Sequence, residues 1–412
     1  MASFYIPLTG LNSDATALNT IANNLSNLNT TAYKDQTVNF SDFFYQQIGE
    51  TGAGNPIQQG SGVQLANIAS NFTQGNVNAT GTASNMAIDG NGFFVLGSGT
   101  GSNVYTRNGN FTVNSTGALV SQDGLSVMGY PATGGVVNTN APLAALTIPV
   151  GQVEAPTATS TISMSANLNS SAAVGTIVPG QIQVYDSLGQ SHTLTINYTK
   201  TASNAWSYSI SLPAGDQTGT GTTANTTGTL TFNSNGTLTA PAANVSGISF
   251  TGLADGASNL NFTWNLYDSN NNPTLTQVDT ASAVSATNQN GYPSGQYQSF
   301  AVNSDGTVVA SFSNGQQQAV GQVALASVVN QQGMKLLGNG EYATTLASGT
   351  AVTNVPGTAG AGTIQGGSLE QSNVNISTEF SNLIIAQRAF EANSKAVTTF
   401  DNVAQDTIDM VR

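Results

Sequence analysis

Two heptad patterns of apolar residues lie at opposite ends of this chain, and they limit its fold more than any other feature. Near the N-terminus the apolar positions are spaced by three and four residues, at Leu8, Leu11, Ala15, Leu18, Ala22 and Leu25. Near the C-terminus they recur at every seventh position, at Leu383, Phe390, Val397, Ala404 and Val411, and Phe380 and Ile384 widen this second stripe. Narrow stripes of this kind are typical of coiled-coil helices, so we predict one helix at each end.

Local signals predict where these helices begin and end. Pro7 suits the first turn of the N-terminal helix, and Asn29–Thr31 is a plausible end. The C-terminal helix is expected over 376–411, which is roughly 54 Å at about 1.5 Å per residue. Asn375 or Ser377 is expected to cap its first turn, because a side-chain oxygen there can accept from free backbone N–H groups.

The narrow stripes favour pairing of the two helices with each other and with neighbouring subunits. The alternative is a pair of ordinary amphipathic helices folded onto a globular body. Gln387, Ser394 and Asp401 interrupt the C-terminal seam, so we expect both ends to be disordered in the isolated chain. Thr20 and Asn393 lie off the apolar stripes, and we expect both positions to tolerate a charge.

The segment between the helices has the pattern of β-structure. Asn-Gly and Asp-Gly dipeptides, which favour tight hairpin turns, begin at Asp89, Asn91, Asn108, Asp123, Asn235, Asp255, Asn290, Asp305, Asn314 and Asn339. Apolar residues alternate with polar ones at Trp206, Tyr208, Ile210 and Leu212. A hairpin is predicted over 181–200 with its turn at 186–189. The Gly-rich segment 350–367 and the aromatic-rich segment 33–62 are expected to be extended connectors.

Composition excludes several classes of function. Lys and Arg total 7 and the net charge is −13, so a phosphate-binding groove cannot be built, and neither nucleic acid nor an anionic membrane is an expected partner. The chain has no cysteine and a single histidine, which excludes disulfides, thiol catalysis and multi-histidine metal sites. We find no transmembrane run of apolar residues and no signal-peptide pattern, which leaves non-classical export or a cytoplasmic location.

No catalytic, cofactor or metal site is expected. His192 lies beside a predicted turn with Asp186 nearby, but no nucleophile motif accompanies it, so we interpret it as a structural or surface histidine. The segment 268–279 resembles part of a calcium-binding loop, yet Pro273 stands where that loop needs glycine, so a hairpin turn is the better interpretation. The chain is therefore not expected to be an enzyme.

Several motifs resemble those of the bacterial flagellar rod and hook proteins, a family of axial structural proteins. The N-terminal motif comprises Asn23, Asn24, Leu25, Ser26 and Asn27, followed by Tyr33 and Lys34. The C-terminal motif lies within 385–395 and includes Gln387, Arg388 and Phe390. Further matching stretches are 72–76, 86–94, 105–111 and 368–374. Ala32 departs from the family pattern, which commonly has glycine there, and this changes the backbone freedom at the helix end.

The resemblance implies a mainly β fold with coiled-coil helices at both termini and two stacked antiparallel β-barrel or sandwich domains, the outer one inserted in the inner one. The expected divisions are a helical core (1–32 and 370–412), a connector (33–70 and 356–369), an inner β domain (71–145 and 285–355) and an outer β domain (146–284). The rod members of the family are shorter and lack the outer domain. The insertion 146–284 therefore makes this chain resemble the hook members.

The resemblance also implies a function, a location and partners. The chain would polymerise with copies of itself into a curved tube that transmits torque as a flexible universal joint between rod and filament. Export through the flagellar type III machinery would place it outside the cell without a cleaved signal peptide. Implied partners are the distal rod protein, the hook-cap protein, the hook–filament junction protein and the hook-length control protein. The alternatives are a distal rod protein, which should lack the insertion, and a secreted β-rich adhesin, which should lack the terminal heptads.

Overall fold

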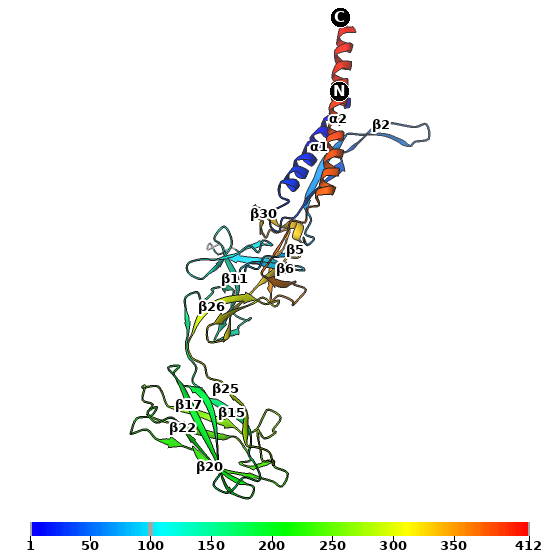
Figure 1. The fold of residues 1–412 in the computed structure, drawn as a ribbon. Coiled ribbons are helices and arrows are strands. Elements are labelled where there is room, and N and C mark those ends of the chain that lie inside the picture. The colour runs from blue at the N-terminus through cyan, green and yellow to red at the C-terminus, as the bar shows by residue number, and fades with distance from the viewer. Residues whose placement is uncertain (1, 98–100, 102, 411–412) are drawn as a thin grey trace. The chain divides into compact units, whose positions relative to one another are not determined.

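The computed structural model describes residues 2–97, 101 and 103–410, and it shows a mainly β chain with a helix at each end, as predicted (Figure 1). Contacts divide the chain into two compact units. The helix-bearing unit comprises Met1–Val150, Ser299–Ala310 and Gln317–Arg412, and the inserted unit comprises Gly151–Gln298 and Ser311–Gln316. One β unit is therefore inserted into the sequence of the other.

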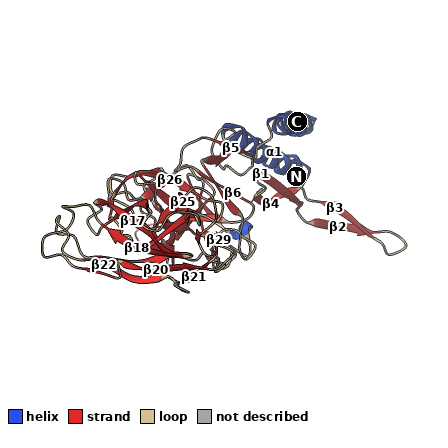
Figure 2. Cartoon of the chain, turned by 60° about the horizontal axis from the view of Figure 1, so that its bottom comes forward, coloured by secondary structure: helices blue, strands red, loops and turns tan. Residues whose placement is uncertain are grey.

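The two terminal helices lie side by side in the helix-bearing unit (Figures 1 and 2). Helix α1 spans Ala2–Ser26 and α2 spans Ile376–Met410. Pro7 was predicted in the first turn of α1, but the helix begins earlier, at Ala2, and Pro7 lies inside it. A proline so near the start of a helix removes only one helical hydrogen bond. Asn375 caps α2 as predicted, because its Oδ1 accepts from the backbone N–H groups of Ser377 (3.0 Å) and Thr378 (3.2 Å). Over the described residues, neither helix is both long and apolar enough to span a bilayer.

The segment after α1, predicted as an extended connector, contains four strands in two antiparallel pairs. Strand β1 (Gln36–Asp42) pairs with β4 (Val63–Ser70), and between them β2 (Tyr45–Glu50) pairs with β3 (Pro56–Gly60). The β2–β3 hairpin extends away from the helices as an isolated arm (Figures 1 and 2). Nearly all of its side chains are exposed, so no buried face imposes a period on its apolar residues.

A long, mainly antiparallel sheet forms the body of the helix-bearing unit. Its central path runs through β26 (Gly295–Val302), β27 (Thr307–Phe312), β28 (Gln317–Val323), β11 (Ser126–Thr133), β7 (Phe93–Gly97), β8 (Asn103–Thr106), β31 (Glu341–Ala343) and β30 (Lys335–Gly338). Shorter strands attached to it are β9 (Thr112–Val113), β10 (Leu119–Val120), β12 (Val136–Val137), β13 (Ala144–Ala145), β29 (Leu325–Ser327) and β32 (Val352–Asn354). A short 3₁₀ helix, Gln331–Gly333, precedes β30. Phe93, Tyr105 and Tyr342 pack together in the hydrophobic core beside this sheet.

Two further strand pairs join the C-terminal segment to the first half of the chain. Strand β33 (Thr363–Gly366) pairs with β6 (Met86–Asp89), and β34 (Ser368–Glu370) pairs with β5 (Val77–Ala79). The Gly-rich segment 350–367, expected as an extended connector, thus supplies strands β32 and β33. Its glycines allow close approach here, since a Cβ on Gly362 would lie 2.3 Å from the Asp89 carbonyl oxygen.

The inserted unit is a sandwich of two sheets around one core. One sheet has the order β16 (Ile177–Tyr185), β17 (Ser191–Ala202), β18 (Ala205–Ser211), β20 (Thr227–Phe232) and β21 (Leu238–Ala240). The other has the order β19 (Thr223–Ala224), β22 (Val245–Phe250), β23 (Leu260–Asn265), β15 (Thr161–Asn167) and β24 (Leu275–Thr276), with β25 (Ala283–Gln289) also on β15. Strand β14 (Val153–Glu154) pairs with the start of β26.

Alternation of apolar residues correctly predicted strands of this unit, whose sandwich architecture the family resemblance implied. Trp206, Tyr208 and Ile210 of β18 are buried while the residues between them are less so, and they share a core with Trp264 of the opposite sheet. The predicted hairpin over 181–200 is β16–β17, and residues 186–190 form its turn.

Candidate assembly surface

Apart from Pro7, the buried side chains among those described in α1 are polar rather than apolar. Ser13, Thr20 and Asn24 are 8%, 7% and 1% exposed, on the face that packs against α2, β1 and β4. At about 3.6 residues per turn, the predicted seam lies on the opposite side of α1. Leu8 is 43% exposed, Ala22 is exposed, and Leu11, Ala15, Leu18 and Leu25 are half-buried. Thr20 was expected to tolerate a charge because it lies off the stripe, but it is buried, and its hydroxyl donates to the Thr16 carbonyl of its own helix.

Helix α2 leaves most of its apolar side chains uncovered in the single chain. Leu383, Phe390 and Val397 of the predicted seam are half-buried, whereas Phe380 is 52% exposed and Ala404 is exposed. Val411 lies outside the described residues. Other exposed apolar side chains on this helix are Ile384, Ile385, Phe400, Val403, Ile408 and Met410. The half-buried residues of the stripe therefore contact the rest of the same chain. The exposed apolar side chains of α2 form a larger surface that this chain does not cover.

The helices run antiparallel and are held in register by a polar contact. The Asn393 side-chain amide donates a hydrogen bond of 2.7 Å to the Asp14 carboxylate. Opposite it, a Cβ on Gly10 would lie 2.7 Å from Asn393 Nδ2, so a larger residue at this position would force the Asn393 side chain to shift. The expectation that Asn393 tolerates a charge was wrong, since it lies between the helices beside an acid.

The N-terminal motif forms the junction between α1 and β1. The Asn24 side chain donates to the Gln36 carbonyl (2.8 Å) and accepts from the Gln36 N–H (3.0 Å). The Tyr33 hydroxyl donates to Asn24 Oδ1 (3.1 Å) and accepts from Asn23 (3.2 Å). The remaining polar motif residues bond locally, Ser26 to the Ala22 carbonyl and Asn27 to the Asn23 carbonyl, while Leu25 is half-buried. This motif therefore fixes the direction in which the chain leaves the helix.

Apart from Asn393, which bonds to Asp14, and the buried Ala386, the C-terminal motif has no comparable role within the single chain. Gln387 is exposed, and Arg388 makes one exposed ion pair with Glu391 at 3.1 Å. Phe390 is half-buried, as are Ala389, Asn393 and Ser394 of the same motif. Side chains that do little for the chain's own fold are available for contacts with other copies.

A buried ion cluster ties three distant segments together below the helices. Lys34 Nζ lies 2.6 Å from Glu370 Oε1, and Arg107 Nη1 lies 3.6 Å from Glu370 Oε2. The side chains of all three are at most 3% exposed. Burial lowers the pKa of Lys34 and Arg107, while Glu370 opposes the shift in both. Sequence reasoning missed this cluster, because only proximity in the fold brings residues 34, 107 and 370 together.

A second acidic group lies between the helices and the following segment. Glu379 is 7% exposed and its Oε2 has no hydrogen-bond partner. Burial raises the pKa of Glu379, the Asn24 side chain opposes this shift, and Asp35 adds to it. Burial also raises the pKa of Asp35. The helix junction therefore holds carboxylates that are unfavourable when ionised.

Exposed apolar side chains continue from the helices onto β1–β4. Phe40, Phe43, Phe44, Tyr45, Ile48, Ile57, Leu65 and Ile68 are each between 40% and 60% exposed. A hollow of about 230 Å³ is lined by Tyr5 and Ile6 of α1 and by Phe43 and Phe44. A two-stranded hairpin with so little covered surface is marginal in water by itself.

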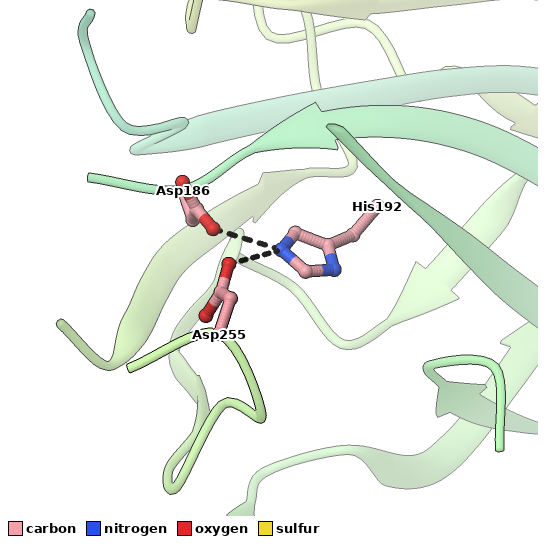
Figure 3. A group of neighbouring side chains, drawn as sticks. All are labelled: Asp186, His192 and Asp255. Atoms are coloured by element: carbon pink, nitrogen blue, oxygen red, sulfur yellow. Dashed lines mark hydrogen bonds and ion pairs between the residues drawn. The ribbon is translucent and has the colours of Figure 1, made fainter. Parts of the chain in front are cut away.

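The single histidine lies in the inserted unit among three carboxylates, two of which, those of Asp186 and Asp255, are drawn in Figure 3. His192 Nε2 is 3.0 Å from Asp186 Oδ2 and 3.8 Å from Asp255 Oδ2, and Nδ1 is 2.8 Å from Asp216 Oδ2. The predicted proximity of Asp186 was correct, whereas Asp216 and Asp255 come from loops that sequence reasoning did not connect to it. Burial lowers the pKa of His192, but its bonds to Asp186 and Asp216 outweigh this and raise it overall.

Comparison with known families covers most of the chain in four segments. Residues 4–34 match the flagella basal body rod protein family, and residues 87–169 match the flagellar hook protein FlgE/F/G D1 domain. Residues 165–292 match the flagellar basal body protein FlaE D2 domain, and residues 365–410 match the flagellar basal body rod FlgEFG protein C-terminal family.

Full-length relatives and a solved structure agree with these matches. The chain is 35% identical to the flagellar hook protein FlgE of Escherichia coli and 36% identical to that of Salmonella typhimurium, over 99% of this chain and 100% of each relative. In fold it is similar to the Helicobacter pylori flagellar hook protein FlgE2, at 14% identity and a TM-score of 0.53 over 70% of this chain and 99% of that one. The chain therefore belongs to the flagellar hook protein FlgE family and is a structural subunit of the flagellar hook, not an enzyme.

Proposed function

We propose that the chain polymerises with copies of itself through one continuous assembly surface. This surface consists of the half-buried stripe of α1, the exposed apolar residues of α2 and the exposed aromatic and aliphatic residues of β1–β4. The observation that carries the proposal is the exposure of so many large apolar side chains on these elements, which marks an interaction surface. Contacts between different faces of successive copies do not close on themselves and so generate a helical tube.

We propose that the chain is divided into a helical core (1–32 and 370–412), a connector (33–70 and 356–369), an inner β domain (71–145 and 285–355) and an outer β domain (146–284). The separate cores of the two units support the division into an inner and an outer β domain, although the compact inserted unit runs from Gly151 to Gln298. Only 7% of residues are charged, so few ion pairs would break when β domains of neighbouring copies slide. Such sliding would let the tube bend while it transmits torque as a universal joint.

The family supports a location and a set of partners. We propose that the chain is exported by the flagellar type III machinery and works outside the cell. There it would contact the distal rod protein at one end of the tube and the hook–filament junction protein at the other. During growth the hook-cap protein and the hook-length control protein would be transient partners.

Electron microscopy of the purified full-length chain under salting-out conditions tests polymerisation. We expect hollow tubes, and particles without helical order would contradict the proposal. Removing residues 146–284 tests the modular division separately. The shortened chain should still fold and form tubes that are straighter than those of the full chain, whereas an unfolded product would show that the boundary is wrong.

A further inference from the structure

One cluster of metal-binding side chains in the inserted unit has no role in the proposed assembly. Asp186 precedes the turn between β16 and β17, and His192 follows it at the start of β17. Asp255 comes from the loop between β22 and β23, and Asp216 from the loop after β18. Figure 3 shows the Asp186 and Asp255 carboxylates on the same side of the imidazole ring. The cluster therefore joins loops from both sheets of the sandwich.

The imidazole ring is oriented as in many metal sites. His192 is 5% exposed, and its Nδ1 lies 2.8 Å from Asp216 Oδ2. When Nδ1 carries the proton and donates it to Asp216, Nε2 has a free lone pair. A carboxylate on the far ring nitrogen is the usual means by which proteins fix this tautomer for a metal ligand. Nε2 then faces Asp186 and Asp255.

Both facing carboxylates are positioned by the backbone through their other oxygen. Asp186 Oδ1 accepts from the N–H groups of Leu188 (2.8 Å) and Gln190 (2.9 Å), and Asp255 Oδ1 accepts from Ala257 (3.0 Å). The Oδ2 atoms of both residues are left to face His192 Nε2. In this tautomer three acceptor atoms converge on one point, which is unfavourable without a cation or a proton between them.

The spacing of these atoms suits a small divalent ion. The distances from His192 Nε2 to Asp186 Oδ2 and Asp255 Oδ2 are 3.0 and 3.8 Å. Two tetrahedral ligands at about 2.1 Å from zinc are about 3.4 Å apart, which lies between these values. Calcium prefers six to eight oxygen ligands at longer distances, so an imidazole with two carboxylates favours a transition-metal ion.

We propose that Asp186, His192 and Asp255 bind one divalent transition-metal ion of the zinc type, with Asp216 as the residue that positions the histidine. The Asp186 side chain is fully buried, whereas that of Asp255 is 28% exposed, so an ion can reach the site from solvent. Water would complete the coordination. The bound ion would fasten the loops of the two sheets together and stabilise the inserted unit by mass action.

The chain is well suited to a clean test, because it has one histidine and no cysteine. Calorimetric titration of the untagged full-length chain with ZnCl₂ should give one ion per chain. Calcium and magnesium should bind at least 100-fold more weakly. The ¹⁵N spectrum of the single imidazole should show a proton on Nδ1 and the zinc-dependent shift on Nε2. Zinc should also raise the melting temperature of the inserted unit by several degrees.

Variants of the proposed ligands distinguish a specific zinc site from nonspecific binding to acidic residues. Asp255→Asn and His192→Gln should each weaken zinc binding more than 10-fold, and Asp216→Asn should weaken it by about 10-fold without changing the fold. Asp268→Asn is the matched control, because Asp268 accepts backbone bonds in a similar exposed turn of the same unit, and it should bind zinc as the parent does. Equal affinity in the parent and Asp255→Asn, or an Nε2 proton that persists at saturating zinc, would overturn the proposal and leave an ordinary histidine–carboxylate cluster.

Discussion

The Asn393 side chain donates a hydrogen bond of 2.7 Å to Asp14 across the pair of terminal helices, and it lies directly against Gly10. Asn393→Asp should therefore weaken the helix pair, because two carboxylates would face each other in a half-buried site. We expect a loss of about 1–2 kcal/mol, seen as a roughly 5- to 30-fold higher critical concentration for tube formation. Asn402→Asp, at an exposed position of α2, is the control and should change this value less than about 2-fold.

Leu18→Asp and Phe390→Asp test the apolar stripes. Each side chain is half-buried in the single chain, and polymerisation would cover the part of it that is still exposed. A buried unpaired carboxylate costs several kcal/mol for every subunit added, so both variants should fail to form tubes in sedimentation assays. Asn19→Asp, next to Leu18 but exposed, should assemble nearly normally. Equal loss in all three variants would mean that the helices meet their neighbours through another face.

Glu370→Gln tests the buried ion cluster. It would leave Lys34 and Arg107 buried with no full counter-charge, at a cost of about 3–5 kcal/mol. The melting temperature of the helix-bearing unit should fall accordingly, while that of the inserted unit stays unchanged. Glu391→Gln removes the acid of the exposed pair with Arg388 and should cost less than about 0.5 kcal/mol. Similar small losses in both variants would contradict a structural role for the cluster.

Glu379 makes the stability of the helix pair depend on pH. Its pKa is raised above the ordinary value of 4.5, so the folded chain takes up this proton before the unfolded chain does. The contribution of Glu379 therefore becomes more favourable as pH falls through its folded pKa toward 4.5, and it is least favourable at neutral pH. Glu379→Gln should raise the melting temperature of the helical signal at pH 7 and reduce its rise on acidification. Glu391→Gln, exposed on the same helix, should leave that rise as it is in the parent.

Ala32 has a left-handed backbone with φ of 55° and is 4% exposed. This conformation costs a residue other than glycine about 1–2 kcal/mol, whereas burial of its methyl group contributes about 0.8 kcal/mol. Ala32→Gly should thus change stability by at most about 1 kcal/mol, in the stabilising direction. Ala32→Val should destabilise by more than about 2 kcal/mol, because a β-branched side chain is strained there. Urea unfolding distinguishes the two, and similar midpoints would contradict the role of the backbone conformation.

The sequence by itself determined the classes of element and their order. Heptad spacing identified both terminal helices, Asn375 marked the start of α2, and alternation around Trp206 identified a strand of the sandwich. These signals are local, because side-chain period and capping depend on residues only a few positions apart. The motifs around Asn23 and Arg388 likewise identified the family without any structure.

Only the tertiary structure decided which face of each element is covered. Thr20 and Asn393 both lie off the stripes of a heptad diagram, yet Thr20 is only 7% exposed and Asn393 bonds to Asp14 across the helix pair. The meeting of Lys34 with Glu370, and of His192 with Asp255, joins loops and strands that are remote in sequence. No periodicity encodes such meetings, since they depend on how separate elements pack in three dimensions.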